Sequence, residues 1–360
     1  MDAAVIIENA LVIILGTIGL AVFGIVFGLL YKGIDRKIAA HMQGRIGPPI
    51  IQPFRDVAKL FTKENIIPDN AIPWVFNLAP IIGLVASISI LLYIPIGGFN
   101  PLLTSRGDII LILYLLMIPS LSMVIGGFSS GSPYATVGAQ REMATMIAYE
   151  FPLAIIIIGI AWRLSRADVF AQINTQNVFA LSTIAGTPVW NFVGPIGFIG
   201  FLLLLFVLVI VTPAELSKIP FDAPEAETEI AGGLLVEYSG RNLAMFYLTD
   251  SVKTVVMASL IVALFIPYNL SPLFGLTSYA AYAVDILFYL VKVFIIILFS
   301  VTLIRVGIAR LKIDQIVYTY WVPLTLISLV ALVLVMWDLW SMTPAPDGLG
   351  WQSIFQMLGL

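Results

Sequence analysis

Between Ala214 and Ser239 the chain carries a dense set of carboxylic acids in a segment interrupted by prolines. Pro224 suits the first position of a helix with Asp222 near its N-cap, and that helix would place Glu225 and Glu229 on one face. Like charges at this spacing repel, so partly buried members should have raised pKa values. A carboxyl group that titrates near neutral pH is what a proton relay needs. The acids of the segment are Glu215, Asp222, Glu225, Glu227, Glu229 and Glu237.

This acidic segment is not composed like an ordinary solvated loop. Phe221, Leu234 and Leu235 are interleaved with the acids, whereas a solvated loop would carry Ser, Lys and Gln there. A solvated charged loop remains the simplest alternative, because most acidic side chains are exposed.

Ionisable residues also recur inside the long apolar stretches. Asp250 and Lys253 share one stretch, and Asp285 and Lys292 lie seven residues apart on one helical face of another. Placing a charge inside a bilayer costs about 2.5–3.5 kcal/mol or more, so such residues usually mark ion pathways or buried ion pairs. We expect Lys253 either to neutralise Asp250 or to serve a pathway.

Glu150 lies eight residues into a predicted span and has no obvious partner within one turn. The nearest charged residues on its own helix are Arg141 and Glu142, at the start of the helix. A functional role in moving protons is therefore favoured for Glu150.

Cysteine is absent and histidine occurs once, at His41. This composition excludes an iron–sulfur cluster or thiolate-bound metal held by the chain itself, and it makes a histidine-rich metal site implausible. We expect no metal site, no cofactor and no catalytic residue in this chain, so any redox chemistry would belong to a partner.

The elements that must position these acids are membrane helices. The 360 residues are 60% hydrophobic and 11% charged, whereas soluble domains carry about 25% charged residues. Apolar runs of about 20 residues suffice to cross a bilayer, and their continuous rather than alternating character selects helices over a barrel. The sequence thus predicts an all-α polytopic membrane protein with about eight transmembrane helices, at 9–31, 74–95, 108–128, 143–162, 194–214, 242–266, 281–304 and 316–338.

The distribution of Lys and Arg between alternate loops predicts the orientation. Arg106, Arg163 and Arg166 are the basic residues of one side, and the opposite, richer side should be cytoplasmic, with both termini outside the cell membrane. The basic residues of that cytoplasmic side are Lys32, Arg36, Lys37, Arg45, Arg55, Lys59, Lys63, Arg141, Lys218, Arg241, Arg305, Arg310 and Lys312.

One predicted helix lies outside the spans, on the cytoplasmic side. Between Ile50 and Phe61, apolar residues fall on one helical face and Arg55, Asp56 and Lys59 on or near the other. This pattern predicts a cytoplasmic amphipathic helix, resting on the membrane or packed under a partner subunit. We divide the chain into a single transmembrane domain, 1–340, and a C-terminal extracytoplasmic tail, 341–360.

Several motifs resemble those of the H-type membrane subunit of the respiratory complex I superfamily. Asp35-Arg36-Lys37 resembles the family's Glu-Arg-Lys after the first helix, Arg45-Ile46-Gly47-Pro48 its Arg-x-Gly-Pro, and Ala148-Tyr149-Glu150 its Ser-Tyr-Glu. The most specific match is Pro220-Phe221-Asp222-x-Pro224-Glu225-Ala226-Glu227-x-Glu229, followed by Val236-Glu237-Tyr238-Ser239. The resemblance covers roughly residues 10–338.

The shortened turn after Arg45 is similar to one branch of this family. Gly47-Pro48-Pro49 runs through Ile51 directly to Gln52-Pro53, without the insertion of quinone-reducing complex I. The chain is therefore most similar to the M subunit of membrane-bound energy-converting hydrogenase and sulfane sulfur reductase complexes.

The resemblance implies a non-catalytic subunit that couples electron transfer to H⁺ or Na⁺ translocation. Its partners would be a hydrogenase-like large subunit and an iron–sulfur small subunit on the cytoplasmic side, antiporter-like membrane subunits, and the lipid bilayer, with no nucleic acid. Iron–sulfur clusters, and in a hydrogenase-type complex a nickel–iron site, would lie on those partners. The implied proton relay comprises Glu142, Glu150, Glu215, Asp222, Glu225, Glu227, Glu229, Glu237 and Asp250. Arg36, Arg45, Asp56 and Lys63 would form the docking face for the hydrophilic arm.

Two other functions stay open at this stage. One is the quinone-binding H subunit of an NADH, F420H2 or ferredoxin:quinone oxidoreductase, with quinone beside Arg36 and Asp222. The other is a stand-alone H⁺- or Na⁺-coupled secondary transporter, against which the lack of an internal repeat argues.

Overall fold

The computed structural model describes residues 3–165, 177–274 and 279–342, and within these ranges the chain is helical without strands. Eight segments are long and apolar enough to cross a membrane, as the sequence predicts. Of the extracytoplasmic tail expected at 341–360, residues 343–360 lie outside the described ranges. The helices that supply the eight spans are α1 (Ala3–Met42), α3 (Pro73–Leu91), α4 (Asp108–Ser129), α5 (Pro133–Leu164), α8 (Pro195–Glu215), α10 (Gly240–Phe265), α11 with α12 (Tyr279–Ile297 and Leu303–Gly307) and α13 with α14 (Ile313–Thr319 and Thr325–Met342).

Two helices extend well beyond the predicted spans, both at the predicted cytoplasmic end. Helix α1 continues to Met42, about eleven residues past the predicted end, and α5 begins at Pro133 rather than at 143. These extensions are amphipathic rather than uniformly apolar, so a hydropathy window misses them. They matter because they carry Lys32, Asp35 and Glu142.

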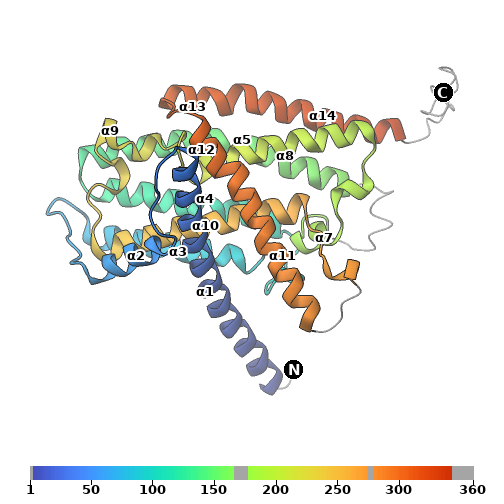
Figure 1. Cartoon of the computed structure of the whole chain (residues 1–360), viewed down its shortest axis with the longest axis horizontal. Helices are drawn as coiled ribbons and strands as arrows, with labels where there is room; N and C mark the ends of the chain where they lie inside the picture. Colours follow the sequence, from blue (N-terminus) through green and yellow to red (C-terminus); the bar gives the residue numbers. More distant parts are fainter. Residues whose placement is uncertain (1–2, 166–176, 275–278, 343–360) are drawn as a thin grey trace.

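Helix α10 is the centre of the bundle. Of its most apolar stretch, 94% is buried inside the chain, against 11% for α1. It packs against α1, α3 and α11. Figure 1 shows α5, α8, α10 and α14 running alongside one another, whereas α1 and α11 cross them obliquely. At Gly28 of α1 a Cβ would lie 2.4 Å from the carbonyl oxygen of Ser251, so glycine allows α1 to approach α10 closely there.

Two of the spans contain a wide π-helical turn. Leu298–Thr302 connects α11 to α12, and Tyr320–Leu324 connects α13 to α14. Pro323 accounts for the second turn, because proline cannot donate the regular helical hydrogen bond. The first turn directs the Thr302 hydroxyl at Asp35 Oδ1, 2.7 Å away.

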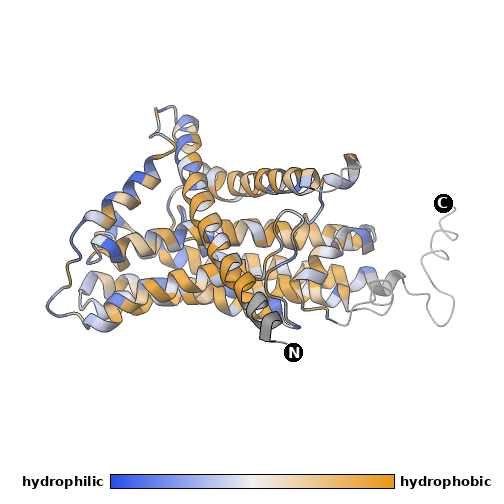
Figure 2. Cartoon of the chain, turned by 90° about the horizontal axis from the view of Figure 1, so that it is seen from below, coloured by the Kyte–Doolittle hydropathy of each residue, from blue (hydrophilic) through white to orange (hydrophobic). Residues whose placement is uncertain are grey.

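The amphipathic helix forms as α2 (Gln52–Thr62). Val57 is buried and Phe54 is half-buried, packed with Leu29 and Leu248 of α1 and α10. Ile51, Ala58 and Phe61, predicted on the same face, are exposed. Figure 2 shows hydrophobic residues along the long helices and hydrophilic ones concentrated toward their ends, where α2 lies.

Short elements join the spans. At the predicted cytoplasmic end, η2 (Ala223–Glu225), α9 (Glu227–Ile230) and η3 (Gly233–Leu235) make up the acidic loop between α8 and α10. At the other end are α7 (Leu181–Gly186), η1 (Val189–Phe192) and η4 (Ser271–Phe274).

Candidate functional site

A cavity of about 510 Å³ opens between α1, the end of α8, the acidic loop and α10. Its wall is unusually rich in ionisable side chains for a protein of this composition. Six are acidic and six are basic: Asp35, Glu215, Asp222, Glu225, Glu227 and Asp250, against Lys32, Arg36, Lys218, Lys253, Arg305 and Arg310.

The acidic loop is folded into the bundle and is not a solvated stretch. Phe221 and Leu234 are 4% and 1% exposed. Gly138 of α5 permits this packing, because a Cβ there would lie 2.7 Å from Leu234 N and 2.9 Å from Pro224 O. The loop thus closes over the cytoplasmic end of α5 and lines the cavity with its acids.

The predicted helix from Pro224 to Glu229 does not form, so Glu225 and Glu229 do not share a helical face. The backbone is extended at Ala226, between η2 and α9. Glu225 lines the cavity, while Glu229 turns to Arg141 Nη1, 2.6 Å away. Ala226 is fully buried, and its place in the core overrides the local helical preference of the acids.

Asp222 does occupy the N-cap position, of the short helix η2, as the sequence predicts. Its side chain makes no cap hydrogen bond and is instead bound by Arg310, whose Nε donates to Oδ1 at 2.8 Å and whose Nη2 binds Oδ2. A guanidinium that grips both carboxylate oxygens offers more hydrogen bonds than a backbone cap. Asp222 therefore ties the loop to the segment that follows α12.

Asp250 is neutralised by two lysines, and neither is Lys253. Lys32 Nζ lies 2.6 Å from Oδ2, and Lys218 Nζ lies 2.8 Å from Oδ1 and 2.7 Å from Oδ2. Lys253, three residues along α10, binds Glu215 instead. The expectation that Lys253 neutralises Asp250 is wrong because two lysines from α1 and the acidic loop already occupy its oxygens.

Lys253 pairs with Glu215 at the inner end of the cavity. Its Nζ lies 2.8 Å from Glu215 Oε1 and donates to Ser120 Oγ at 2.8 Å. The two charged side chains are 3% and 2% exposed. Ser120 in turn lies 3.4 Å from the Tyr149 hydroxyl. The result is a buried polar cluster that joins α4, α5, α8 and α10.

Glu142 and Glu150 lie on α5 behind this cluster. Glu142 is 1% exposed, and its Oε2 accepts a weak hydrogen bond from Ser217 Oγ at 3.4 Å. Within the described residues, Oε1 of each glutamate is buried without a hydrogen-bond partner. Arg141, a possible partner of Glu150 by sequence, is engaged by Glu229 instead. Glu142 is thus a buried carboxylate and Glu150 a half-buried one. A carboxylate removed from water without a cation is costly to keep charged.

Two charged groups of the acidic loop have shifted pKa values. Burial raises the pKa of Glu225, against the attraction of Lys218. Burial alone would lower the pKa of Lys218. The attraction of the Asp250 carboxylate has the larger effect, so the pKa is raised above that of an ordinary lysine. The two pKa values are thus raised for different reasons, by burial for Glu225 and by a neighbouring carboxylate for Lys218.

The remaining predicted relay acids lie further out. Glu227 is exposed and lines the cavity mouth. Glu237 is half-exposed and does not line the cavity. Glu229 is partly exposed in its pair with Arg141.

The predicted docking residues divide into two kinds. Arg45 and Lys63 are exposed. Arg36 and Asp56 pair at 3.2 Å, and Arg36, which lines the cavity, also contacts the Tyr247 hydroxyl. Arg36 and Asp56 remain partly exposed in their pair, so all four predicted docking residues reach the surface.

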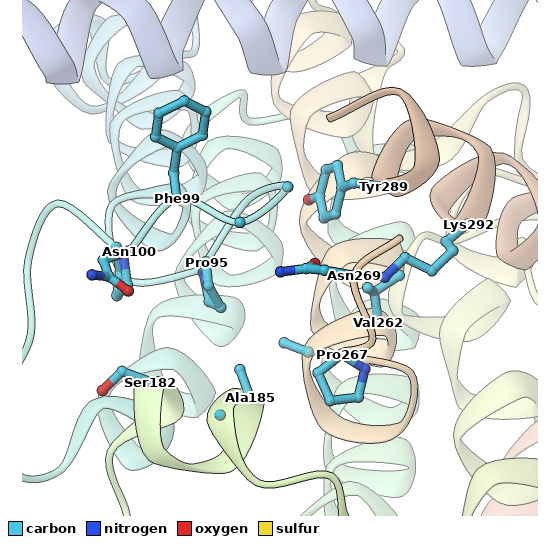
Figure 3. Close-up of a pocket in the computed structure, with 15 residues that line it drawn as sticks. Pro95, Phe99, Asn100, Ser182, Ala185, Val262, Pro267, Asn269, Tyr289 and Lys292 are labelled. Carbon is cyan, nitrogen blue, oxygen red and sulfur yellow. The ribbon is translucent and has the colours of Figure 1, made fainter. Parts of the chain in front are cut away.

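A second cavity, of about 180 Å³, lies at the opposite end of α10. Asn269, Tyr289 and Lys292 line it together with the segment 95–101 and α7 (Figure 3). Asp285 and Lys292 do not bind each other directly across their shared face; each holds the loop after α10 instead. Asp285 accepts hydrogen bonds from Leu270 N, Ser271 N and Ser271 Oγ. Lys292 donates to the carbonyl oxygens of Ile266 and Tyr268.

Sequence reasoning missed the cations that complete the first cavity. In the sequence Lys32, Lys218, Arg305 and Arg310 serve only as markers of orientation, yet each binds a specific acid. Their one sequence signal is that they flank the spans at the same end as the acids. Among the residues that the structure describes, no group of His, Cys, Asp and Glu has the arrangement of a metal site.

Most of the chain is similar to known proteins. A family model described as NADH dehydrogenase matches residues 15–336. The H subunit of the F(420)H(2) dehydrogenase of Methanosarcina mazei is 29% identical, over 87% of this chain and 91% of the relative. The H subunit of the NADH-quinone oxidoreductase of Syntrophotalea carbinolica is 30% identical, over 85% of this chain and 90% of the relative.

The fold agrees with a solved structure. A chain from the structure of the membrane-bound sulfane sulfur reductase, an archaeal respiratory membrane complex, matches with a TM-score of 0.76. It is 29% identical, and the match covers 90% of this chain and 99% of that one. The similar proteins are thus subunits of multisubunit membrane oxidoreductase complexes.

Proposed function

The chain belongs to the NADH dehydrogenase family, as an H-type membrane subunit of the complex I superfamily, and from this premise we propose that it couples electron transfer in a cytoplasmic arm to ion movement in the membrane. In this role the chain transfers no electrons. It receives protons in the cavity beside the acidic loop and passes them to buried carboxylates of α5.

The observation that carries this proposal is the contrast between paired and unpaired acids. Four acids of the cavity wall each have a cation within 3 Å: Asp35, Asp222, Asp250 and Glu215. In the described part of the chain Glu142 and Glu150 form no ion pair, although both have a buried oxygen atom. The pairs of Asp35, Asp222 and Asp250 shape the cavity, whereas buried acids without a cation readily bind and release protons.

We infer the order of the relay from which of its charged groups influence one another. Glu225 interacts electrostatically with Glu142, and Glu142 with Glu215 and Lys253. Glu150 in turn interacts with Glu215 and Lys253. A proton would therefore pass from Glu225 through Glu142 and Glu215 to Glu150, with water bridging the longer gaps.

Partners and cofactors follow from the same role. A hydrogenase-like large subunit and an iron–sulfur small subunit would bind at the cavity end, where Arg45, Lys63 and the exposed Ile46 lie. Antiporter-like membrane subunits would receive the coupling signal from α5. This chain would contribute no cofactor, and iron–sulfur clusters would reside on the partners. The cavity end would face the cytoplasm, with both termini outside the cell membrane.

The test uses the whole complex, purified through a tag on this chain and reconstituted into liposomes. Reduced viologen supplies electrons, with protons, polysulfide or a short-chain quinone as acceptor. We expect Glu150→Gln to assemble and transfer electrons like the parent, while proton translocation falls by roughly 100-fold. Normal translocation in Glu150→Gln would reject the relay, and purification of an active transporter without partner subunits would reject the coupling role.

A quinone-binding subunit is the second candidate, because one wall of the cavity is apolar. Met123, Leu235, Leu243 and Phe246 line it, and one relative is the H subunit of an NADH-quinone oxidoreductase. Organic extraction of the purified complex distinguishes the two: a quinone recovered in equimolar amount, and displaced on Phe246→Trp, would favour this candidate. The short Gly47-Pro48-Pro49 turn favours the first proposal.

A further inference from the structure

Three lysines of the cavity wall bind only two carboxylates. Lys32 and Lys218 both bind Asp250, and Lys253 binds Glu215. Lys253 lies three residues from Asp250 on α10, a spacing at which two side chains share a helical face. Both residues also line the same cavity. Asp250 is therefore a second carboxylate within the reach of Lys253.

Lys253 occupies the point that any proton on the relay must pass. Glu215 lines the cavity, whereas Glu150 does not, and the two carboxylates influence each other electrostatically. While Lys253 holds Glu215 at 2.8 Å, its positive charge favours the ionised carboxylate and makes Glu215 a weaker proton acceptor than it would be without this cation. Its other charged neighbours, Glu142 and Glu150, cannot replace this cation because both are acids.

We propose that Lys253 is a positioning residue that controls proton passage through Glu215 by alternating between Glu215 and Asp250. This inference rests on the proposed relay and adds its gate. With Lys253 on Glu215, as in this structure, passage is blocked. When Lys253 moves to Asp250, Glu215 takes a proton from the cavity and gives it to Glu150. Lys253 keeps its own proton throughout.

The acidic loop supplies the means to move Lys253. Glu225 interacts with Lys218 and Lys32, the two lysines that hold Asp250. When Glu225 ionises, its charge attracts both lysines and weakens their hold on Asp250, so that Asp250 can attract Lys253. Ser120, which accepts from Lys253 in the blocked state, is left to hydrogen bond with Tyr149 alone.

The direct test observes the protonation of Glu215 in the purified complex. Infrared difference spectra with isotope-labelled glutamate report the carbonyl stretch of each protonated carboxyl group. Lys253→Met leaves Glu215 buried without a cation, so we expect one additional protonated-carboxyl band, which disappears in the double variant Lys253→Met/Glu215→Gln. A spectrum of Lys253→Met identical to the parent would overturn the inference.

A second variant keeps the test decisive if Lys253→Met does not assemble. Lys253→Arg retains the charge but can grip Glu215 with two nitrogen atoms, so it should release the carboxylate more slowly. We expect electron transfer to persist while the number of protons moved per electron falls. An ion pair that is merely structural predicts full coupling in Lys253→Arg, and that result would overturn the gate.

Asp250→Asn tests the alternative partner in the same proteoliposomes. It removes the charge to which Lys253 moves while leaving the Lys253–Glu215 pair in place, so coupling should be lost. Full coupling in Asp250→Asn would exclude Asp250 from the gate.

Glu150→Gln separates the gate from the relay. Loss of coupling in Glu150→Gln with full coupling in Lys253→Arg would leave the proposed function standing and reject the gate alone. Full coupling in Glu150→Gln would reject the relay itself.

Discussion

Arg310 grips both carboxylate oxygens of Asp222 across 88 residues of sequence. The pair connects the acidic loop to the segment between α12 and α13, and Arg310 also donates to Thr228 Oγ1 at 3.3 Å. The cavity therefore has a wall whose position depends on contact between two distant segments. A displacement of either segment would move the loop acids relative to α5.

Loss of this two-point contact should loosen the loop. Arg310→Lys keeps the positive charge but cannot bind both oxygens, so we expect the loop to lose about 1.5–3 kcal/mol of anchoring free energy. The measurement is the rate of limited proteolysis between α8 and α10 in the solubilised complex. The control is Lys312→Arg, which exchanges the same two residue types at an exposed position. Equal cleavage rates in Arg310→Lys and the parent would contradict the anchoring role.

Gly138 should be intolerant of a single methyl group. Alanine normally stabilises a helix relative to glycine by about 0.5–1 kcal/mol. At Gly138 its Cβ would meet the backbone of Leu234 and Pro224, and overpacking of this kind costs about 1–3 kcal/mol. Gly138→Ala should thus lower the melting temperature in detergent.

Gly19→Ala provides the matched control for this change. Gly19 is also helical, but nothing lies within 4 Å of a Cβ built there. We expect its melting temperature to equal or exceed that of the parent. A similar response at both positions would show that close loop packing on α5 does not limit stability.

The spans could be predicted from the sequence because length and hydropathy are local properties. All eight helices occur in the predicted order, and the errors fall where α1 and α5 continue past the membrane as amphipathic helices. The unusual mixture of acids and apolar residues in the acidic loop is also a local property, so the sequence shows it. The helical geometry of the loop was predicted wrongly, because burial of Ala226 is decided by tertiary contacts rather than by its neighbours.

The pairing of charges could not be predicted. Lys253 is near Asp250 in sequence, yet Lys32 from α1 and Lys218 from the loop bind Asp250 instead. Which cation reaches a buried acid depends on how three segments pack. For the same reason Arg310 counted toward orientation but could not be assigned to Asp222.

The orientation of the chain can be tested directly, because it has no cysteine of its own. Lys63 and Arg106 are both exposed, at opposite ends of the bundle by the predicted topology. In intact cells a membrane-impermeant maleimide should label Arg106→Cys at once and Lys63→Cys only after permeabilisation. The reverse pattern would place the cavity outside the cell and contradict docking of a cytoplasmic arm.

Glu225 should make the stability of the complex depend on pH in a defined direction. Burial raises its pKa above the ordinary value of about 4.3, so the folded chain holds this proton more tightly than the unfolded chain. Below the ordinary value both states are protonated, and Glu225 contributes nothing to the pH dependence. As the pH rises toward the raised value, the unfolded chain ionises first and the folded state loses stability.

Glu225→Gln cannot ionise, so it should escape this loss. We expect its melting temperature in detergent to match the parent at acidic pH and to exceed it increasingly as the pH rises past the ordinary carboxyl range. Glu227→Gln, the same substitution on an exposed side chain two residues along, controls for the chemical change. A difference in melting temperature between Glu225→Gln and the parent that stays constant with pH would mean that Glu225 has the same pKa in the folded and unfolded chain. In that case it could not be the acid that exchanges protons with the cavity, and the relay would have to begin at Glu142.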